Sequence, residues 1–471
     1  MAATSASNVS PNNPLTQALD REALARPTDL AITFLGPSNN RRDISWSELA
    51  RRVGAIASRL TLNGWPGAVL CVPAGTDEAG VLELLGAVAG NCRVFPFDPS
   101  APDTATDHLR AALCVTGEPW VLVADALQSQ NTVAATHQRL SVYLATGGST
   151  GEPKLIERHV RSRASELLRK TGWTSGQRQM VLGPLYHAAG LDRLIDGVIA
   201  GNHVILPENL NPLEIAAAVE DCEVNWMQFT PSHMRLLEPH FRHANLEHLR
   251  GVLHSAAPCP DGTKEAWLSF LPADCLWEMY TSTEGIGTTL CSGQEWLLHR
   301  GTVGRGFFTQ IRILADSKPV PAGEVGDVYM RSVQHSQPGQ RAESFVSVGD
   351  RGFLDDGGYL YLAGRRTGHA IVGGENVYTS EIEAALVRHP SVSGAIVVDV
   401  PDEVLGSALS CVLELRPGSE VTKRSIIEYC VENLALHSVP RQVTFIPDLP
   451  RTAAGKVSPA TREEWRRRLS R

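Results

Sequence analysis

Residues 143–157 read YLATGGSTGEPKLIE, where an apolar run gives way to three glycines, a Ser-Thr pair and a lysine. Glycine permits unusual dihedral angles and a close approach of the backbone to a ligand. Ser149, Thr150 and exposed backbone amides can donate hydrogen bonds, and Lys154 adds a positive charge. The stretch therefore predicts a loop wrapped around an anion.

The loop departs from the Walker-type phosphate loop. That template places lysine directly after the last glycine and a hydroxyl after the lysine. Here Glu152 and Pro153 intervene, and Leu155 follows Lys154. Taken by itself, the stretch is equally compatible with a flexible turn between a strand and a helix.

Length and charge narrow the class of protein. The chain has 471 residues, more than one hydrophobic core usually holds, so two or more domains are expected. The formal charge is −8, from 43 basic and 51 acidic residues without long runs of one sign. This pattern indicates neither nucleic acid nor an anionic membrane as a partner. No segment reaches the roughly 18 to 20 uncharged apolar residues that a membrane helix needs.

The cysteines indicate a reducing compartment. There are nine, widely scattered and without a CxxC pair, so we expect neither disulfides nor a zinc site. The N-terminal stretch MAATSASNVSPNNP lacks the apolar core of a signal peptide. We therefore expect a cytoplasmic protein in which residues 1–13 are disordered.

The N-terminal half alternates short apolar runs with helical patterns. Ser45 and Glu48 have the spacing of a capping box, and an apolar face follows them. A helix is expected at 77–89. The expected strands are 68–75, 93–98, 121–125, 142–148, 180–183, 203–207, 224–231 and 251–258. This alternation predicts an α/β fold with largely parallel sheets covered by helices.

The pattern changes in the C-terminal third. Residues 312–332 read as a strand, a Pro/Gly turn and a second strand, which predicts an antiparallel hairpin. A break at 364–370 precedes helices near 380–388 and 424–435 and strands at 393–399, 408–415 and 441–446. We expect a large domain at 14–366, ending in a small β region, and a small α+β domain at 367–471.

Eight short motifs occur in one order along the chain. They are TGGSTGEPK (146–154), PLYHAAG (184–190), MYTSTEG (279–285), GTVGR (301–305), GEVGDVYMRS (323–332), GDRGFLDDGGYLYLAGR (349–365), GGENVYTSEIE (373–383) and PRTAAGK (450–456). Together they resemble the core motifs of the adenylate-forming enzymes, a superfamily of acyl-CoA synthetases, adenylation domains and luciferases. Each motif is weak alone, but eight in the same order make a chance match very improbable.

The resemblance implies a mobile C-terminal domain and a reaction in two halves. A carboxylate attacks the α-phosphorus of ATP to give an acyl-adenylate and pyrophosphate, and a nucleophile then displaces AMP. The implied cofactors are ATP, Mg²⁺ and CoA. Amides, hydroxyls, lysine and the metal would offset the repulsion between the triphosphate and the carboxylate.

The resemblance also assigns roles to matching residues. The catalytic candidates are Lys456, Thr150 and His187. The cofactor-binding candidates are Thr146, Gly147, Gly148, Ser149, Thr150, Gly151 and Lys154 at the phosphates, Thr283 at the α-phosphate, Ala257 and Tyr280 at the adenine side, Asp350 and Arg365 at the ribose, and Gly374 at the pantetheine tunnel. Glu284 is the candidate Mg²⁺ ligand. The alternatives without a functional role are a loop acid for Glu284, a core aromatic for Tyr280, a turn-capping acid for Asp350 and surface cations for Arg365 and Lys456.

Two departures from the family pattern concern the hinge and the loop. Thr367 and Gly368 stand where the family usually has an acidic hinge contact, and Leu155 replaces a small residue. These changes leave adenylation plausible and make the second half-reaction harder to predict.

The acceptor and the acid remain open at this level. CoA is favoured because the GGEN turn at 373–376 is intact. An amine acceptor, with Asp192 as base, and the thiol of a carrier protein are the alternatives, and a nucleotide-binding protein without turnover is an alternative of another class. The partner would be a small-molecule carboxylic acid. The candidates to hold it are mostly small or apolar, which suits an aryl or hydrophobic acid better than an amino acid: His187, Gly190, Asp192, Asn225, Met227, Phe229, Ala256, Ala257, Thr281 and Gly285. Asp192 and Asp196 keep an amino acid substrate possible.

Overall fold

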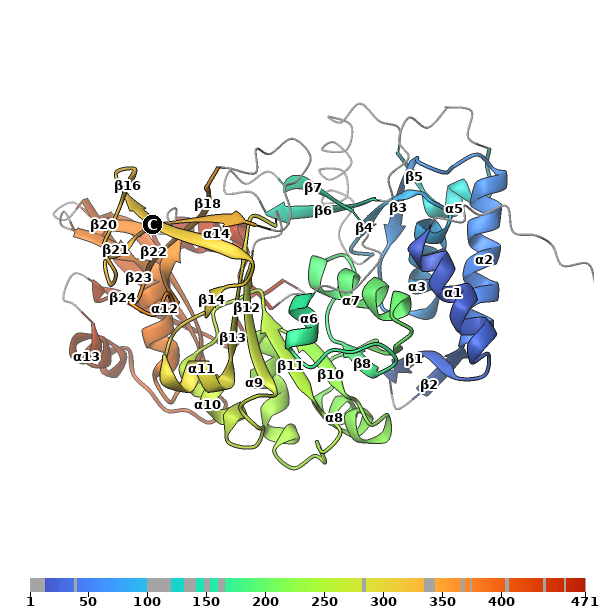
Figure 1. Ribbon diagram of the computed structural model, residues 1–471. Coiled ribbons are helices and arrows are strands. Elements are labelled where there is room, and N and C mark those ends of the chain that lie inside the picture. The colour runs from blue at the N-terminus through green and yellow to red at the C-terminus, as the bar shows by residue number, and fades with distance from the viewer. Residues whose placement is uncertain are drawn as a thin grey trace, which may run out of the picture. The chain divides into compact units, whose positions relative to one another are not determined.

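The computed structural model describes residues 13–470 except 38–39, 100–119, 131–140, 148–152, 160–165, 282–284, 334–343, 366–368, 373–374, 403–405, 435–437 and 453–454. The chain forms two compact units (Figure 1). The first comprises Met1–Gly148, Glu152–Phe229 and Arg235–Leu253. The second comprises Ser149–Gly151, Thr230–Met234 and His254–Arg471.

The elements up to β11 follow one another as strands and helices. In chain order they are α1 (Pro14–Ala25), β1 (Leu30–Gly36), β2 (Asn40–Ser45), α2 (Trp46–Leu62), β3 (Val69–Pro73), α3 (Glu78–Ala89), β4 (Arg93–Phe97), β5 (Trp120–Leu122), α5 (Val123–Ala126), β6 (Ser141–Gly147), β7 (Pro153–His159), α6 (Glu166–Lys170), β8 (Arg178–Val181), α7 (Ala188–Ile199), β9 (His203–Pro207), α8 (Pro212–Asp221), β10 (Trp226–Phe229), α9 (Pro231–Phe241) and β11 (Gly251–Ser255).

Most strand pairs in the first unit are parallel. The neighbours β1 and β9, β9 and β8, and β8 and β10 run parallel, with β2 antiparallel at the outer edge. A second sheet has the order β5-β3-β4-β6-β7, in which only the β6–β7 pair is antiparallel. This confirms the predicted α/β architecture.

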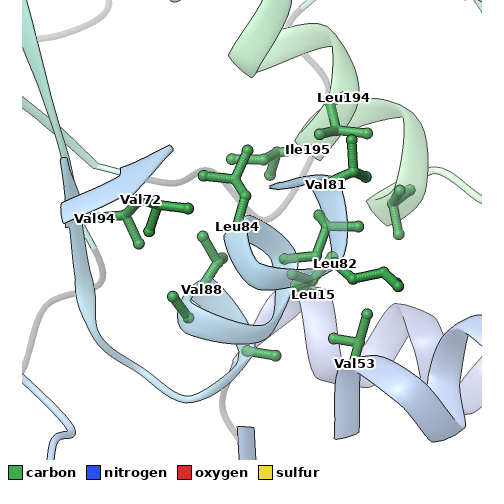
Figure 2. Close-up of a cluster of buried hydrophobic side chains, with 14 of the residues drawn as sticks. Leu15, Val53, Val72, Val81, Leu82, Leu84, Val88, Val94, Leu194 and Ile195 are labelled. Atoms are coloured by element: carbon green, nitrogen blue, oxygen red, sulfur yellow. The ribbon is translucent and has the colours of Figure 1, made fainter. Parts of the chain in front are cut away.

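Local sequence signals explain the helices around this core. The hydroxyl of Ser45 accepts a hydrogen bond from the backbone N–H of Glu48 at 3.3 Å and caps α2, as its spacing predicted. The buried face of α2 includes Val53, which packs in one cluster with side chains from α1, α3 and α7. Figure 2 shows this cluster, with Leu84 and Val88 of α3 near Val72 and Val94 of the strands.

The strand expected at 121–125 was wrong in its second half: it ends at Leu122, and a helical turn, α5, begins at Val123. The segment after the glycine-rich loop is a strand, β7, so the alternative of a turn between a strand and a helix was wrong, and β7 was not among the expected strands. Its sequence PKLIERH lacks a clear alternation of apolar and polar residues, so its conformation depends on pairing with β6 rather than on its own pattern.

The later elements belong to the second unit and are mostly antiparallel. They are α10 (Asp261–Leu268), β12 (Leu276–Thr281), β13 (Thr288–Ser292), α11 (Gly293–Leu298), β14 (Arg305–Gly306), β15 (Thr309–Ala315), β16 (Lys318–Pro319), β17 (Gly326–Ser332), β18 (Val346–Leu354), β19 (Leu360–Arg365), β20 (His369–Val372), β21 (Glu375–Tyr378), α12 (Thr379–Arg388), β22 (Val392–Asp402), β23 (Gly406–Leu415), α13 (Lys423–Asn433), β24 (Gln442–Ile446) and α14 (Pro459–Leu469).

The hairpin expected at 312–332 is confirmed, with Ile311 of β15 opposite Met330 of β17. These strands belong to the five-stranded sheet β16-β15-β17-β18-β19. The predicted elements beyond residue 380 also form. There β22, β23 and β24 form a three-stranded sheet. Side chains of α12, α13 and α14 pack against it, which gives the expected α+β arrangement. We call the part from β20 to α14 the C-terminal lobe.

Candidate functional site

The glycine-rich loop joins two antiparallel strands. Thr146 of β6 lies opposite Lys154 of β7, and Gly147 lies opposite Pro153. The predicted lysine therefore lies at the loop end of the hairpin, directly across from the predicted threonine. Gly148, Ser149, Thr150 and Gly151 lie outside the described residues.

Two predicted nucleotide residues are joined directly in the second unit. The hydroxyl of Tyr280, on β12, donates a hydrogen bond to Oδ2 of Asp350, on β18, at 2.5 Å. Arg365 of β19 is the cross-strand partner of Asp350. Three residues that are separated in the sequence thus come together. The arrangement offers an aromatic ring and a carboxylate, and the backbone of Arg365 lies opposite that of Asp350.

The residues that follow β12 are only partly described. The hydroxyl of Thr281 donates to the carbonyl of Gly287 at 2.9 Å and accepts a hydrogen bond from the hydroxyl of Thr288 at 3.1 Å. These bonds tie the end of β12 to the start of β13. Thr283 and Glu284 lie outside the described residues, whereas Gly285 has a φ of 67°.

An unusual backbone conformation follows β11. Ala256 is exposed and has a φ of 77°, in the left-handed region that disfavours a side chain. Ala257 comes next and is not among the residues with positive φ. Strained residues of this kind are concentrated at functional sites. The role of Ala256 as a substrate residue stays a prediction.

The predicted acyl residues of the first unit lie on α7 and β10. His187 occupies the N-cap of α7, and its ring centroid is 4.9 Å from that of Tyr186. A Cβ on Gly190 would lie 2.5 Å from the carbonyl oxygen of Pro184, so only glycine fits there. Phe229 ends β10 and is buried.

Asp192 has a partner that the sequence did not reveal. Its Oδ2 lies 2.9 Å from Nη2 of Arg158 on β7, and both side chains are about one-third exposed, 33% and 28% respectively. Asp196 likewise pairs with Arg193 at 2.7 Å. Both carboxylates raised as possible contacts of an amino acid are therefore engaged by arginines.

A closed turn carries Lys456 in the C-terminal lobe. The backbone N–H of Thr452 donates to the carbonyl of Lys456, and the N–H of Gly455 donates to the carbonyl of Thr452, each at 2.7 Å. The N–H of Lys456 also lies 3.3 Å from the hydroxyl oxygen of Thr452. Gly455 has a φ of 71°, which favours glycine at this point of the turn. The side chain of Lys456 is exposed.

The residues predicted at the metal, the pantetheine tunnel and the hinge lie mostly in short gaps of the described chain. Gly374, Thr367 and Gly368 lie outside the described residues, next to the hairpin in which Val372 of β20 pairs with Glu375 of β21. Within the described part of the chain, no three His, Cys, Asp or Glu side chains come together as metal ligands. The described helices include none long and apolar enough to cross a membrane.

Comparison with known proteins identifies the family. Residues 96–337 match the model of the AMP-binding enzymes, and residues 381–456 match that of the AMP-binding enzyme C-terminal domain. The first match alone covers more than half of the chain. The chain belongs to the AMP-binding enzyme family.

Two relatives and one solved structure are similar over most of the chain. A 3-[(3aS,4S,7aS)-7a-methyl-1,5-dioxo-octahydro-1H-inden-4-yl]propanoyl:CoA ligase of Mycobacterium tuberculosis is 30% identical, over 82% of this chain and 80% of the relative. A sulfoacetate–CoA ligase of Cupriavidus necator is 27% identical over 86% and 82%. The amide bond synthetase McbA of Marinactinospora thermotolerans has the same fold, with a TM-score of 0.76, 22% identity and coverage of 96% and 100%.

Proposed function

We propose that this protein activates a small carboxylic acid with ATP and transfers the acyl group to CoA. In the first half-reaction a carboxylate oxygen attacks the α-phosphorus of ATP, and the bond to the bridging oxygen breaks to release pyrophosphate. In the second, the thiol sulfur of CoA attacks the acyl carbon, loses its proton, and AMP leaves with the bonding electron pair. The product is a thioester.

The contact between Tyr280 and Asp350 carries this proposal. A carboxylate beside an aromatic ring can accept the ribose hydroxyls while the ring packs on the base. Family membership and the names of the CoA ligase relatives support the reaction type. Lys456 is the proposed cation for the charge that develops at the α-phosphate, because a point charge on a long stem can follow the reacting group.

Magnesium would act mainly through the phosphates of ATP. Mg²⁺ in such sites usually binds one or two carboxylates together with phosphate oxygens and water. Glu284 is the candidate protein ligand, as the resemblance to the adenylate-forming enzymes implies. The metal would neutralise the charge of the phosphates during attack.

An amide-forming reaction is the second candidate, supported by the similarity to the amide bond synthetase fold. It would need a base, for which Asp192 was the candidate. The ion pair with Arg158 weakens this role, since the guanidinium competes with an incoming amine for the same carboxylate. This contact favours CoA as the acceptor.

The compartment we propose is the cytoplasm. Four buried thiols without disulfides support it: Cys92, Cys222, Cys291 and Cys411.

ATP–pyrophosphate exchange with a panel of carboxylic acids tests the first half-reaction. We expect exchange with at least one acid, and a loss of about 100-fold or more in Lys456→Ala. Lys423→Ala is the matched control, because Lys423 is an exposed lysine of the same lobe at the start of α13. ATP binding without exchange for any acid would instead indicate a nucleotide-binding protein without turnover.

Mass spectrometry of the products then identifies the acceptor. Reactions with the active acid would contain CoA, a set of amines or a carrier protein with its pantetheine arm. An acyl-CoA product confirms the proposal. An amide or an acylated carrier protein, without acyl-CoA, would contradict it.

A further inference from the structure

One carboxylate holds the base of the turn that carries Lys456. Glu414, on β23, lies opposite Gly394 of β22. Its Oε2 accepts hydrogen bonds from the backbone N–H of Leu449 at 3.0 Å and from Nη1 of Arg451 at 2.6 Å. Its Oε1 accepts a hydrogen bond from the hydroxyl of Ser393 at 2.8 Å. Both oxygens are engaged, and two of the three donors belong to the segment that leads into the turn.

The environment of Glu414 makes these bonds strong. The side chains of Glu414 and Arg451 are only 16% and 22% exposed. Burial alone would raise the pKa of Glu414, but the hydrogen bonds from Leu449, Ser393 and Arg451, with the charge of Arg451, lower it below its ordinary value. The carboxylate is therefore charged at neutral pH, and bonds to a charged acceptor are stronger than neutral ones.

Apolar packing fixes the two stems of the turn to the same sheet. Leu449 precedes the turn and is 2% exposed, in a cluster with buried residues of β22 and β23. Val457 follows the turn and packs against the same cluster. Between the fixed stems, two side chains hold the turn: Arg451, bound to Glu414, and Ser232, whose hydroxyl donates to the carbonyl of Gly455 at 3.2 Å.

Gly394 leaves the room that Arg451 needs. A Cβ on Gly394 would lie 2.4 Å from Nη2 of Arg451 and 2.7 Å from Cδ1 of Leu449. Any side chain at this position would push the guanidinium away from Glu414. One cross-strand pair thus supplies both the acceptor, Glu414, and the space beside Gly394 that the guanidinium of Arg451 occupies.

We propose that Glu414 is a positioning residue for Lys456, which it orients through Arg451 and the backbone of Leu449. This inference rests on the proposed role of Lys456 in adenylation. Lysine has a flexible stem, so the position of its backbone determines how often the ammonium group reaches the reacting phosphate. A misplacement of about 1 Å at a reacting centre can cost roughly 100-fold in rate.

Glu414→Gln tests the proposal with little change of shape. Glutamine can keep its one amide oxygen toward the N–H of Leu449 and donate from its amide nitrogen to the hydroxyl oxygen of Ser393, but it presents no charge to Arg451. We expect kcat for ATP–pyrophosphate exchange to fall about tenfold or more, with KM for ATP and acid within about twofold. Transfer to CoA from a synthetic acyl-adenylate should stay within about twofold of the parent, because the role proposed for Lys456 is confined to adenylation. Gly394→Ala, which displaces Arg451 without removing a charge, should reduce exchange in the same way.

A second carboxylate–arginine pair in the same lobe serves as a control that distinguishes a positioning role from a general effect on stability. Glu383 of α12 accepts two hydrogen bonds from Arg462 of α14 and is 15% exposed, close to the 16% of Glu414. Glu383→Gln should lower the melting temperature to a similar extent but leave exchange nearly unchanged. In a Lys456→Ala background, Glu414→Gln should cause no further loss, because a positioning residue has nothing left to position.

Hydrogen–deuterium exchange of the peptide 448–457 gives a readout that does not depend on activity. Faster deuterium uptake in Glu414→Gln than in Glu383→Gln would support the proposal. Equal uptake, equal ATP–pyrophosphate exchange in the two variants, or a full additional loss in the Lys456→Ala background would overturn it. An inactive parent protein would refute the proposed function, whereas the uptake measurement would still decide whether Glu414 orders the turn.

Discussion

The two ends of strand β12 make different contacts with charged groups. Near its buried start, Glu278 accepts a hydrogen bond from Lys264 of α10 at 2.5 Å, and the two residues are 6% and 3% exposed. The ring of Trp296 lies 4.8 Å from the same ammonium group. Two residues further on, Tyr280 contacts Asp350, and both of these residues are partly exposed.

The contact between Glu278 and Lys264 is suited to stabilising the fold, whereas the contact between Tyr280 and Asp350 is suited to binding a ligand. Burial alone would lower the pKa of Lys264, but the charge of Glu278 and the hydrogen bond between them raise it above the ordinary value. Water cannot replace either partner there, so each charge depends on the other. Tyr280 and Asp350 are partly exposed, so a ligand can reach them from solvent. We therefore expect mutations at the two ends to affect different measurements.

Lys264→Met should have the largest effect on stability. It leaves Glu278 as an unpaired buried charge, which costs about 3–5 kcal/mol of unfolding free energy. Chemical denaturation monitored by tryptophan fluorescence measures the loss. A second change, Glu278→Leu, should recover most of it, since the double variant contains no unpaired charge. A loss below about 1 kcal/mol in Lys264→Met would show that solvent reaches this end of β12 and that the two ends do not differ in this way.

Tyr280→Phe should affect binding more than stability. Removal of the hydroxyl frees Asp350 to turn away from the ribose, and we expect ATP affinity to fall about tenfold, or ~1.4 kcal/mol. Isothermal titration calorimetry with ATP measures the change. Tyr361→Phe is the matched control, because Tyr361 donates to Asp355 at 3.3 Å in the same sheet but was not predicted to bind a ligand. Similar losses in both variants would argue against a nucleotide site at Tyr280.

His254→Leu tests how the buried interior responds to pH. His254 is fully buried, neither ring nitrogen has a hydrogen-bond partner among the described residues, and burial together with the charge of Lys264 holds its pKa well below 6.5. The folded state therefore keeps this ring neutral, whereas the unfolded chain takes up a proton as pH falls through 6.5. Stability is complete above that pH and is lost below it, by about 1.4 kcal/mol per pH unit for one proton.

The variant should lose stability less steeply between pH 6.5 and 5 than the parent. Urea denaturation at several pH values gives the two slopes. His233, whose pKa burial lowers to about 4, is present in both proteins and contributes the same slope to each. Parallel curves would mean that His254 takes up its proton in the folded state.

Local signals in the sequence explain which elements could be predicted. The cap at Ser45 and the apolar face of α2 lie within a few residues of one another, so the helix could be read directly. The C-terminal lobe was also predictable, since α12, β22 and β23 each carry their own periodic pattern. Strand β7 was missed because its position at a sheet edge depends on β6 and not on its own residues.

The candidate site shows the same limit. Tyr280, Asp350 and Lys456 could be proposed because each lies in a short motif. The contact between Tyr280 and Asp350 could not, because the two positions are 70 residues apart. Glu414 gave no signal at all, since one acid in a strand is not distinctive until the fold brings Arg451 to it. Motifs identify residues that contact a ligand, whereas the residues that position them can be found only from the tertiary structure.

Ala256→Gly should have the smallest effect and should separate strain from binding at a single exposed residue. The left-handed conformation costs a residue with a Cβ about 1–2 kcal/mol, and glycine removes this cost while it loses up to about 1 kcal/mol of chain entropy on folding. We therefore expect a net stabilisation of about 0.5–1 kcal/mol, measured as a rise in melting temperature. Ala257→Gly, at the next residue, has no such strain to relieve and should be destabilising. If the methyl group of Ala256 also contacts the acid, as the sequence predicts, KM for the acid should rise in the more stable variant. A protein that is less stable after Ala256→Gly would show that this turn stores no strain, and the conformation would then be no guide to function.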